Sequence, residues 1–489
     1  MQQKDPTAIF LAAQALMSLQ QTHGLFPRII GKGDNAHRLM ELLLRMRSEA
    51  AAEDDVPRFG LLPSANIESL IIIDRDIDFA TPLLTQLTYE GLIDEMFGIK
   101  DNSAEIDSSI IGAAPGAQLG KAPAAPTQQG LKRKIQLDSS DKLYDQLRDA
   151  NFAIVDSLLN KIARRLQSDM ESRHAAKSTS ELRDFVNKLP GYQSEQASLK
   201  THIALTEEIM KHTQSDLFRR CLEVQQNLAD GTDPSSQHET LEELIARDTP
   251  LPTILRLLCL ESLISGGLRL KDLESFKRLI LHAYGYQHLL TLSNLEKIGL
   301  LQTRATTNIL SNPIGAGSSA QEGSKTNYNY LRKVLRMWVD EVNEAAPNDI
   351  SYVYSGYAPL SVRLVQAIIQ KPHLLSITRG SVQPATNGIS SAAHGWQGFE
   401  DALRNIKGET FNKVQKGEEQ AVKARHILSG KGGKTVVVMF LGGVTRTEIA
   451  ALRFLVRGGE RKVLVCTTGV VSGGGVMEAV IEKGDFGRT

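Results

Sequence analysis

The sequence predicts an α/β protein, with a mostly parallel-sheet α/β domain that is interrupted by a large helical insertion carrying a protruding helical hairpin. Three observations support this prediction. A short aliphatic run, Leu70–Ile73, reads as a strand near the start, and two strand–helix units follow one another after Thr435. Between them, residues 141–300 show apolar side chains almost only at helical spacing. Because isolated strands are not stable, the distant strands should pair with one another across the helical stretch.

Composition excludes several classes of protein. The 489 residues correspond to roughly three domains of about 150 residues. With 56 basic and 56 acidic residues the net charge is zero, which argues against broad electrostatic binding to nucleic acid or to anionic lipid. The three cysteines are scattered and form no CxxC pair, which fits a reducing cytosol and suggests no zinc knuckle. No stretch reaches the ~18 apolar residues of a membrane span.

The first part of the chain is predicted to hold two helices, a strand and a third helix. Apolar residues at Ile9, Ala12, Ala13 and Leu16 indicate an amphipathic helix, and a second helix follows. We interpret 1–52 as a helical lead-in and 53–140 as the first part of the α/β domain. The latter contains the buried strand ending at Asp74, a helix that Pro82 opens and Gly98 ends, an Ala/Pro/Gly-rich loop at 112–130, and a short strand at 131–137.

The middle of the chain is predicted to be helical. Residues 141–250 are expected to form the hairpin and residues 251–310 a compact set of short helices. Ser139, Ser140 or Asp141 can cap the first of these helices. Proline inside a helix costs about 3 kcal/mol, so Pro190 is expected to mark a loop tip or a hinge.

The last part, 327–489, is predicted to complete the α/β domain. The strand TVVVMFL precedes a helix opened by a capping box, Thr445 to Glu448, and a second strand precedes a helix opened by three glycines. Residues 311–326 are expected to be a loose loop, and 380–433 a Gly/Ser/Lys-rich segment in which EEQAVKARHIL is a candidate helix.

Two glycine-rich motifs resemble phosphate-binding loops only in part. GKGGKT at 430–435 lacks the first glycine of a P-loop, where Leu428 stands, and it precedes a strand instead of following one. GKGDNA at 31–36 fits the GxGxxA pattern, but the segment before it is short and contains Pro27. We therefore expect Asp34 to cap the next helix and no nucleotide to bind here.

The motif IIIDRDID resembles the Asp-x-Asp of haloacid-dehalogenase-like phosphohydrolases, in which one carboxylate is the nucleophile, the other an acid/base, and Mg²⁺ holds the phosphate. A Mg²⁺-dependent phosphohydrolase using Asp74 and Asp76 is therefore an alternative function. Against it, Asp78 stands where that family has Thr or Val, and no partner motifs follow the later strands. The simpler interpretation is that these carboxylates cap the next turn and pair with Arg75 or other basic groups. GxSxG and HExxH are also absent, so we predict no catalytic, metal or cofactor residues.

Several long segments together resemble the Sec/Munc (SM) family, whose members bind SNAREs and promote membrane fusion. They are IIIDRDIDFATPLLTQLTYEGLIDEMFGI, LPGYQ before a long helix, and FLGGVTRTEIAALRFL. SLQQTHGLFPRIIGKGDNA, LDSSDKLYDQLRDANF, LILHAYGYQHLLTLSNLEKIGLL and SYVYSGYAPLSVRLVQ narrow the likeness to the SM subunit of the HOPS and CORVET tethering complexes. The resemblance implies the predicted fold, no enzymatic activity and no cofactor. It also implies an N-terminal α/β domain, which we expect to be missing here.

The resemblance further implies that the hairpin is a template on which target-membrane and vesicle SNARE motifs are aligned. Here it would be built from about 147–173 and 181–217, with Leu189–Tyr192 at the hinge. The expected SNARE-binding residues are Leu182, Phe185, Val186, Leu189 and Pro190. By pattern alone, these residues more simply pack the core of the hairpin itself.

A second implied surface binds the helical-solenoid subunit of the class-C core complex through Lys277, Tyr286 and Leu289. The alternative is that Tyr284 and Tyr286 are partly buried core residues. The resemblance implies a cytoplasmic protein at vacuole/lysosome and late endosome membranes, held there through its partners.

Overall fold

The computed structural model describes residues 5–52, 63–111, 132–174, 179–304, 325–379, 395–414 and 434–482. The chain forms two compact units. The first, here called the sheet unit, comprises Met1–Leu84, Val224–Glu341 and Gly356–Thr489. The second, the hairpin unit, comprises Thr85–Glu223 and Val342–Ser355.

A five-stranded sheet in the order β5-β1-β2-β6-β7 forms the centre of the sheet unit. β1 and β2, β2 and β6, and β6 and β7 pair in parallel, whereas β5 runs antiparallel to β1. The strands are β1 (Arg28–Lys32), β2 (Ile67–Asp74), β5 (Thr410–Val414), β6 (Thr435–Leu441) and β7 (Lys462–Thr467). The predicted pairing across the helical stretch is confirmed, because Ile71 of β2 lies opposite Val438 of β6.

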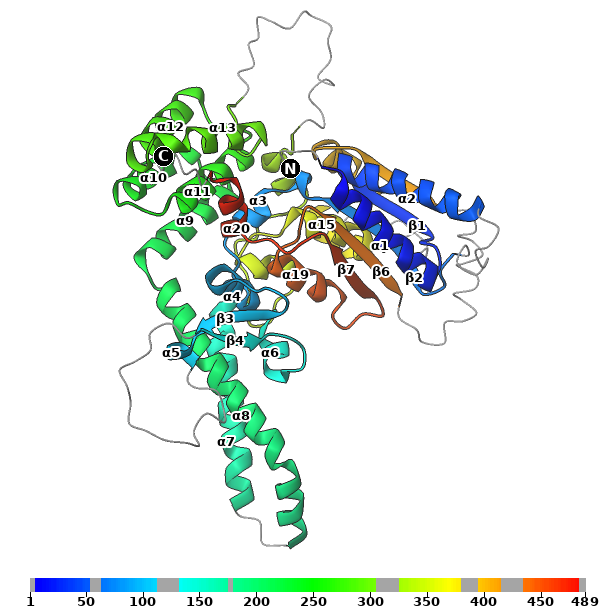
Figure 1. Cartoon of the computed structure of the whole chain (residues 1–489), viewed down its shortest axis with the longest axis vertical. Coiled ribbons are helices and arrows are strands. Elements are labelled where there is room, and N and C mark those ends of the chain that lie inside the picture. Colours follow the sequence, from blue (N-terminus) through cyan, green and yellow to red (C-terminus); the bar gives the residue numbers. More distant parts are fainter. Residues whose placement is uncertain are drawn as a thin grey trace, which may run out of the picture. The chain divides into compact units, whose positions relative to one another are not determined.

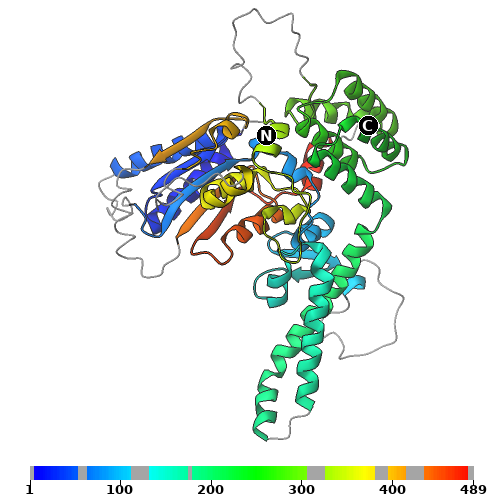
Figure 2. The same cartoon turned by 180° about the vertical axis from the view of Figure 1, so that it is seen from behind.

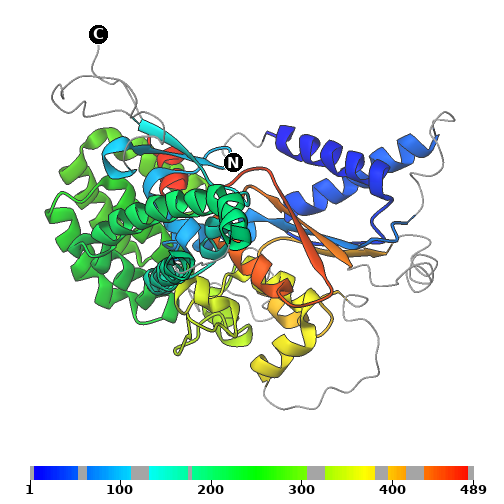
Figure 3. The same ribbon diagram turned by 90° about the horizontal axis from the view of Figure 1, so that it is seen from below.

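Helices cover both faces of this sheet (Figure 3). α1 (Thr7–His23) and α2 (Asp34–Ala52) lie on one face, and α15 (Leu360–Ile369) and α19 (Arg446–Val456) lie on the other. Every residue of β2 is buried, which explains why this strand is a continuous apolar run instead of an alternating one. Ala12, Ala13 and Leu16 of α1 are buried in the core, as the amphipathic spacing predicted.

Two segments of the sheet unit differ from the prediction. Residues 1–52 are not only helical, because β1 lies within them; Pro27 directly precedes the strand, where its missing N–H is tolerated. Residues 380–433 are not only a loop, because α17 (Glu400–Arg404) and β5 lie within them. Buried Trp396, Phe399 and Phe411 anchor this segment.

The remaining elements of the sheet unit are mostly short helices, as predicted for 251–310. They are η2 (Arg75–Ile77), α3 (Ala80–Leu83), η3 (Pro234–Gln237), α10 (His238–Ala246), α11 (Leu251–Ile264), α12 (Leu270–Tyr284), η4 (Tyr286–His288), α13 (Leu289–Lys297), α14 (Tyr328–Val334), α16 (Lys371–Arg379) and α20 (Gly473–Val480). Within the described ranges, no helix combines the length and the hydrophobicity needed to cross a bilayer.

Two long antiparallel helices, α7 (Phe152–His174) and α8 (Thr179–Thr213), dominate the hairpin unit (Figures 1 and 2). The smaller elements gather at one end of this pair, here called the root. They are α4 (Tyr89–Phe97), β3 (Ser103–Asp107), α5 (Ser108–Ile111), β4 (Lys132–Gln136), α6 (Lys142–Leu147) and η6 (Ile350–Tyr354); α9 (Asp216–Asp230) leads out of the unit. Apolar residues of α4, α6, α7 and α8 share one buried cluster at the root.

The hairpin exists as predicted, but Pro190 does not end a helix. α8 continues through Pro190 and Gly191, and Leu147 belongs to α6 instead of the hairpin. Helix formation is cooperative, so one lost hydrogen bond does not have to break a helix of 35 residues. The connection between α7 and α8 spans residues 175–178, which lie outside the described residues.

Candidate protein-binding site

Both oxygens of the Asp74 carboxylate, at the end of β2, accept hydrogen bonds from backbone N–H groups. Its Oδ1 accepts a hydrogen bond from the Asp76 N–H at 3.2 Å, and its Oδ2 accepts one from the Asn35 N–H at 2.9 Å. Burial raises the pKa of Asp74, and the nearby Asp76 adds to this effect. Asp76 instead forms an ion pair with Lys407, at 2.9 Å between Oδ2 and Nζ. The first carboxylate therefore caps the turn η2, as the simpler interpretation predicted.

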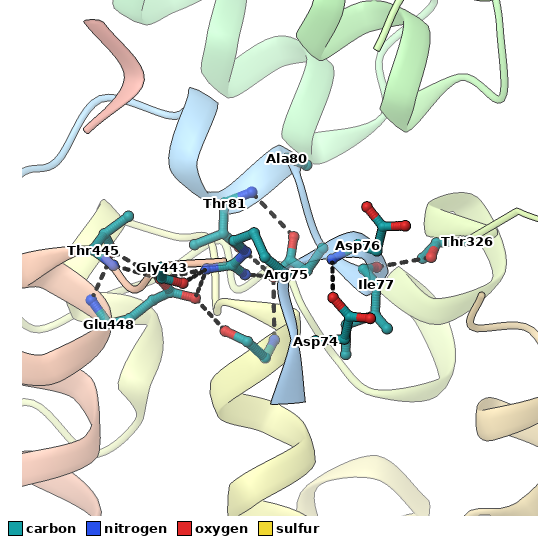
Figure 4. A network of polar contacts seen from close by, with 12 residues as sticks. Asp74, Arg75, Asp76, Ile77, Ala80, Thr81, Thr326, Gly443, Thr445 and Glu448 are labelled. Atoms are coloured by element: carbon teal, nitrogen blue, oxygen red, sulfur yellow. Dashed lines mark hydrogen bonds and ion pairs between the residues drawn. The ribbon is translucent and has the colours of Figure 1, made fainter. Parts of the chain in front are cut away.

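The Arg75 side chain points away from Asp74 and Asp76, to the opposite side of the end of β2 (Figure 4). Its NH1 lies 2.9 Å from Glu448 Oε2, and its NH2 lies 3.5 Å from Asp78 Oδ2. Burial lowers the pKa of Arg75, but Glu448 and Asp78 together hold it above its usual value. Glu448 also completes the predicted capping box by accepting from the Thr445 N–H at 2.8 Å. Arg75 thus pairs with Glu448 and Asp78 and not with the Asp-x-Asp carboxylates.

The GKGDNA motif occupies the position of a dinucleotide fingerprint more closely than the sequence suggested, since its first two residues end β1 and its last three open α2. However, a carboxylate of the chain itself lies at the start of α2, where the phosphate of a dinucleotide would bind in such a motif. A Cβ on Gly33 would lie 2.3 Å from the Cβ of Asp74, whose carboxylate caps the helix. The expectation that Asp34 is the cap is therefore wrong: its Oδ1 accepts from the Glu409 N–H instead.

These contacts give the Asp-x-Asp motif a structural role. Asp74 binds backbone N–H groups, and Asp76 pairs with a lysine. Among the residues that the structure describes, no group of three or more His, Cys, Asp or Glu side chains could hold a metal ion. A pocket beside Asp76 is lined by polar and apolar groups, including Lys407, Thr326, Gln302, Ile298 and Phe79.

The expected SNARE-binding residues all lie on α8. They are Leu182, Phe185, Val186, Leu189 and Pro190, and their side chains lie outside the described residues. The motif GKGGKT at 430–435 lies mostly outside them too. Assignment of the SNARE-binding residues therefore stays a prediction.

An exposed apolar surface, here called the Tyr286 surface, follows the end of α12. Tyr286 is 70% exposed, Leu289 is 59% exposed and Leu290 is 47% exposed. Tyr284 behaves differently, because it is half-buried and its hydroxyl donates to the Thr249 carbonyl. Burial raises the pKa of Tyr284. Lys277 of α12 forms an ion pair with Glu296 of α13, so the two helices are tied beside this surface.

We did not predict Leu290 as part of this surface, although its position in the sequence indicates it. Leu289 and Leu290 are adjacent at the start of a helix, and neighbouring residues point about 100° apart. Buried Leu292 and Leu295 already supply the inward face of α13. Exposed Tyr and aliphatic side chains of this kind are typical of interface hot spots.

Relatives of known name match almost the whole chain. Vacuolar protein sorting-associated protein 33A of Rattus norvegicus is 38% identical over 482 residues, which cover 98% of this chain and 72% of the relative. Vacuolar protein sorting-associated protein 33 of Schizosaccharomyces pombe is 33% identical over 474 residues, which cover 96% of this chain and 72% of that relative. The homologue in Arabidopsis thaliana is 32% identical over 488 residues, with 98% and 72% covered.

Solved structures share the fold at lower identity. The SM protein Vps45 in complex with the Qa SNARE Tlg2 aligns with a TM-score of 0.61 and 17% identity, over 97% of this chain and 70% of that protein. The Unc18–syntaxin 1 complex from Monosiga brevicollis aligns with a TM-score of 0.56 and 15% identity, over 96% and 71%. The Sec1 family matches residues 1–479. The likeness to SM proteins inferred from the sequence segments is thereby confirmed, and the chain belongs to the Sec1 family.

Proposed function

We propose that this chain is a non-enzymatic, SNARE-binding protein that templates SNARE complex assembly for vesicle fusion at the vacuole or lysosome and late endosome. The observation that carries the proposal is the match of nearly the whole chain to proteins named for vacuolar protein sorting. Two solved structures with the same fold support it, since those proteins are in complex with a Qa SNARE and with syntaxin 1.

The hairpin of α7 and α8 is the proposed template. A SNARE motif must order its backbone to become a helix, at about 1–2 kcal/mol per residue. A preformed helical surface that aligns two such segments lowers the cost of nucleating their bundle. We propose that residues 141–250 supply this surface, with Leu182, Phe185, Val186, Leu189 and Pro190 of α8 in contact with the SNARE helices.

Binding of purified vacuolar SNARE motifs, added singly and in pairs, tests this assignment. We expect the double variant Phe185→Asp, Leu189→Asp to weaken binding at least tenfold, because two charges would enter an apolar contact. Ser194→Asp is the matched control, since it places one charge on an exposed position of the same helix. Equal binding of the wild type and the double variant would show that the template lies elsewhere.

We further propose that the Tyr286 surface, within 251–310, binds the helical-solenoid subunit of a class-C tethering complex such as HOPS or CORVET. Lys277, Tyr286 and Leu289 are the proposed contacts. Tyr286→Asp should abolish co-purification with that subunit, whereas Leu270→Asp should not. Leu270 is 60% exposed and lies at the other end of α12, so it controls for added surface charge. A complex that survives Tyr286→Asp rules out this surface.

The two proposed surfaces imply where the chain acts. We propose that it is cytoplasmic and reaches vacuole/lysosome and late endosome membranes through its protein partners, without binding nucleic acid or lipid directly. The zero net charge supports this, since neither nucleic acid nor anionic lipid would be attracted over a wide surface. Fractionation of cells with and without the solenoid subunit tests it: the membrane-associated share should fall when that subunit is absent.

A further inference from the structure

A buried polar cluster joins α8 to the root of the hairpin. His202 of α8 is 1% exposed. Its Nδ1 lies 2.8 Å from the Tyr89 hydroxyl, and its Nε2 lies 3.2 Å from Asp141 Oδ2. The ring stacks on Tyr144 with a centroid distance of 6.0 Å and meets Tyr89 edge-on at 5.8 Å. Three root elements, α4, α6 and the turn before α6, thus contact a single side chain of α8.

Asp141 connects two helices through its two oxygens. Oδ1 caps α6 by accepting from the N–H groups of Leu143 and Tyr144, at 2.9 and 3.2 Å. Oδ2 accepts from the Ser198 hydroxyl at 2.6 Å and contacts His202. Burial raises the pKa of Asp141, but the hydrogen bonds from His202, Ser198 and Tyr144 hold it well below its usual value. The carboxylate is therefore charged at neutral pH and accepts strong bonds.

Ser198 and His202 are one helical turn apart, so both point from the same side of α8. Apolar packing at the root is non-directional, so it constrains the rotation of a helix less sharply than hydrogen bonds do. Hydrogen bonds require a narrow range of angles, so two of them to one fixed carboxylate specify the rotation of the helix. Because α8 has 35 residues, about 52 Å in length, the same rotation applies to the whole helix, far beyond the root.

We propose that Asp141, Ser198 and His202 form a root latch that fixes the rotation of α8 and so selects the face that the hairpin presents to a helical partner. In this proposal His202 is a positioning residue, since it acts through α8 and touches no partner. The role in selecting the face rests on the proposed function of the hairpin, whereas the fixing of the rotation does not.

Two variants loosen the latch in different ways and leave the cap of α6 in place. His202→Leu keeps the apolar volume but removes both polar contacts. Ser198→Ala removes one hydrogen bond and raises the helix propensity of α8. If Ser198 served only the stability of α8, this variant would therefore lose neither stability nor binding. Asp138→Ala is the control, because the hydrogen bonds of this carboxylate come from Gln136 and Ser140, in the segment just before α6.

Pulsed electron paramagnetic resonance on the full chain measures the rotation. Spin labels at Gln193→Cys on α8 and Lys134→Cys on β4, both exposed, report one distance distribution within the hairpin unit. The background carries Cys466→Ser, because Cys221 and Cys259 are buried whereas Cys466 is only half-buried. Binding of a purified SNARE motif is measured on the same samples without labels.

We expect a broader distance distribution for Ser198→Ala and a still broader one for His202→Leu, with Asp138→Ala like the wild type. SNARE-motif binding should weaken about tenfold in His202→Leu, since losing a hydrogen bond to a charged group shifts an equilibrium by roughly that factor. Unchanged distributions in both latch variants overturn the proposal. If the distance distributions broaden but SNARE-motif binding is unchanged, the latch does not select the face that the hairpin presents. If the wild type binds no SNARE motif, the proposed function fails, while the distances still decide whether the latch exists.

Discussion

Replacing Glu448 by Gln should destabilise the sheet unit by about 3 kcal/mol. The substitution removes one charge from a buried pair whose members, Arg75 and Glu448, are 1% and 0% exposed. Removing one partner of such a pair typically costs about 3–5 kcal/mol, because the other charge stays buried without compensation. Gln can still accept from the Thr445 N–H, so the capping box of α19 is kept, while its amide nitrogen replaces the oxygen that accepts from Arg75 and Ser361.

The geometry places the expected value at the lower end of that range. At 2.9 Å and an effective dielectric constant of about 20, Glu448 attracts Arg75 by roughly 6 kcal/mol. Asp78, at 3.5 Å from the other nitrogen, supplies a similar attraction of roughly 5 kcal/mol and remains in the variant. Arg75 is thus left with one counter-ion. Adding Arg75→Met to Glu448→Gln would leave Asp78 buried without a counter-ion, so the double variant should be no more stable than the single variant.

Urea unfolding followed by tryptophan fluorescence measures these changes. The protein has two tryptophans, Trp338 and Trp396, and both lie in the sheet unit, so the signal reports that unit. The control is Asp76→Asn, which breaks the half-exposed pair with Lys407 and should cost at most about 1 kcal/mol. If Glu448→Gln costs no more than this control, the reasoning from buried charge is refuted.

Two further predictions concern the sheet unit. Gly33→Ala should lower the stability of this unit by roughly 2–4 kcal/mol, because φ is +111° and the new Cβ would meet Asp74. Gly458→Ala, at φ +74° with open space around it, should cost only about 1 kcal/mol. Similar urea midpoints for the two variants would contradict this prediction. The hydrogen bond to Glu261 raises the pKa of His238, so its contribution is complete below the unfolded pKa near 6.5 and is lost as pH rises through the folded value. Amide exchange in α10 should therefore accelerate more between pH 6 and pH 9 than the chemistry of exchange alone requires, and His238→Gln should remove the excess.

The strands with the strongest sequence signal were those buried on both faces. β2 and β6 have almost no exposed residue, so each is a run of aliphatic side chains that reads as a strand without any partner in view. β5 has the sequence TFNKV, in which Phe411 is the one buried residue, and its pattern does not differ from that of a polar loop. We did not predict β1, because Pro27 directly precedes it and Gly31 lies within it. Gly31 is required there because a Cβ would lie 2.2 Å from the Phe411 ring.

Polar contacts between distant parts of the chain had no sequence signal. The capping box at Thr445 was predictable because both members lie within one turn, but its glutamate also binds Arg75, which is 373 residues away. The same holds for Asp141, where the cap was predictable and the contacts to Ser198 and His202 were not. Local hydrogen bonds follow from spacing, whereas partners across the fold depend on how the elements pack.

The carboxylate of Asp74 at the start of α2 has one more consequence. In proteins that place a nucleotide phosphate at such a helix, the anion comes from solution, and stability rises with its concentration through mass action. Here the anion is attached to the neighbouring strand, so it is present at a fixed effective concentration in every folded molecule. The N-terminal partial charge of α2 is thus met by a carboxylate within the chain, with no need for an anion from solution.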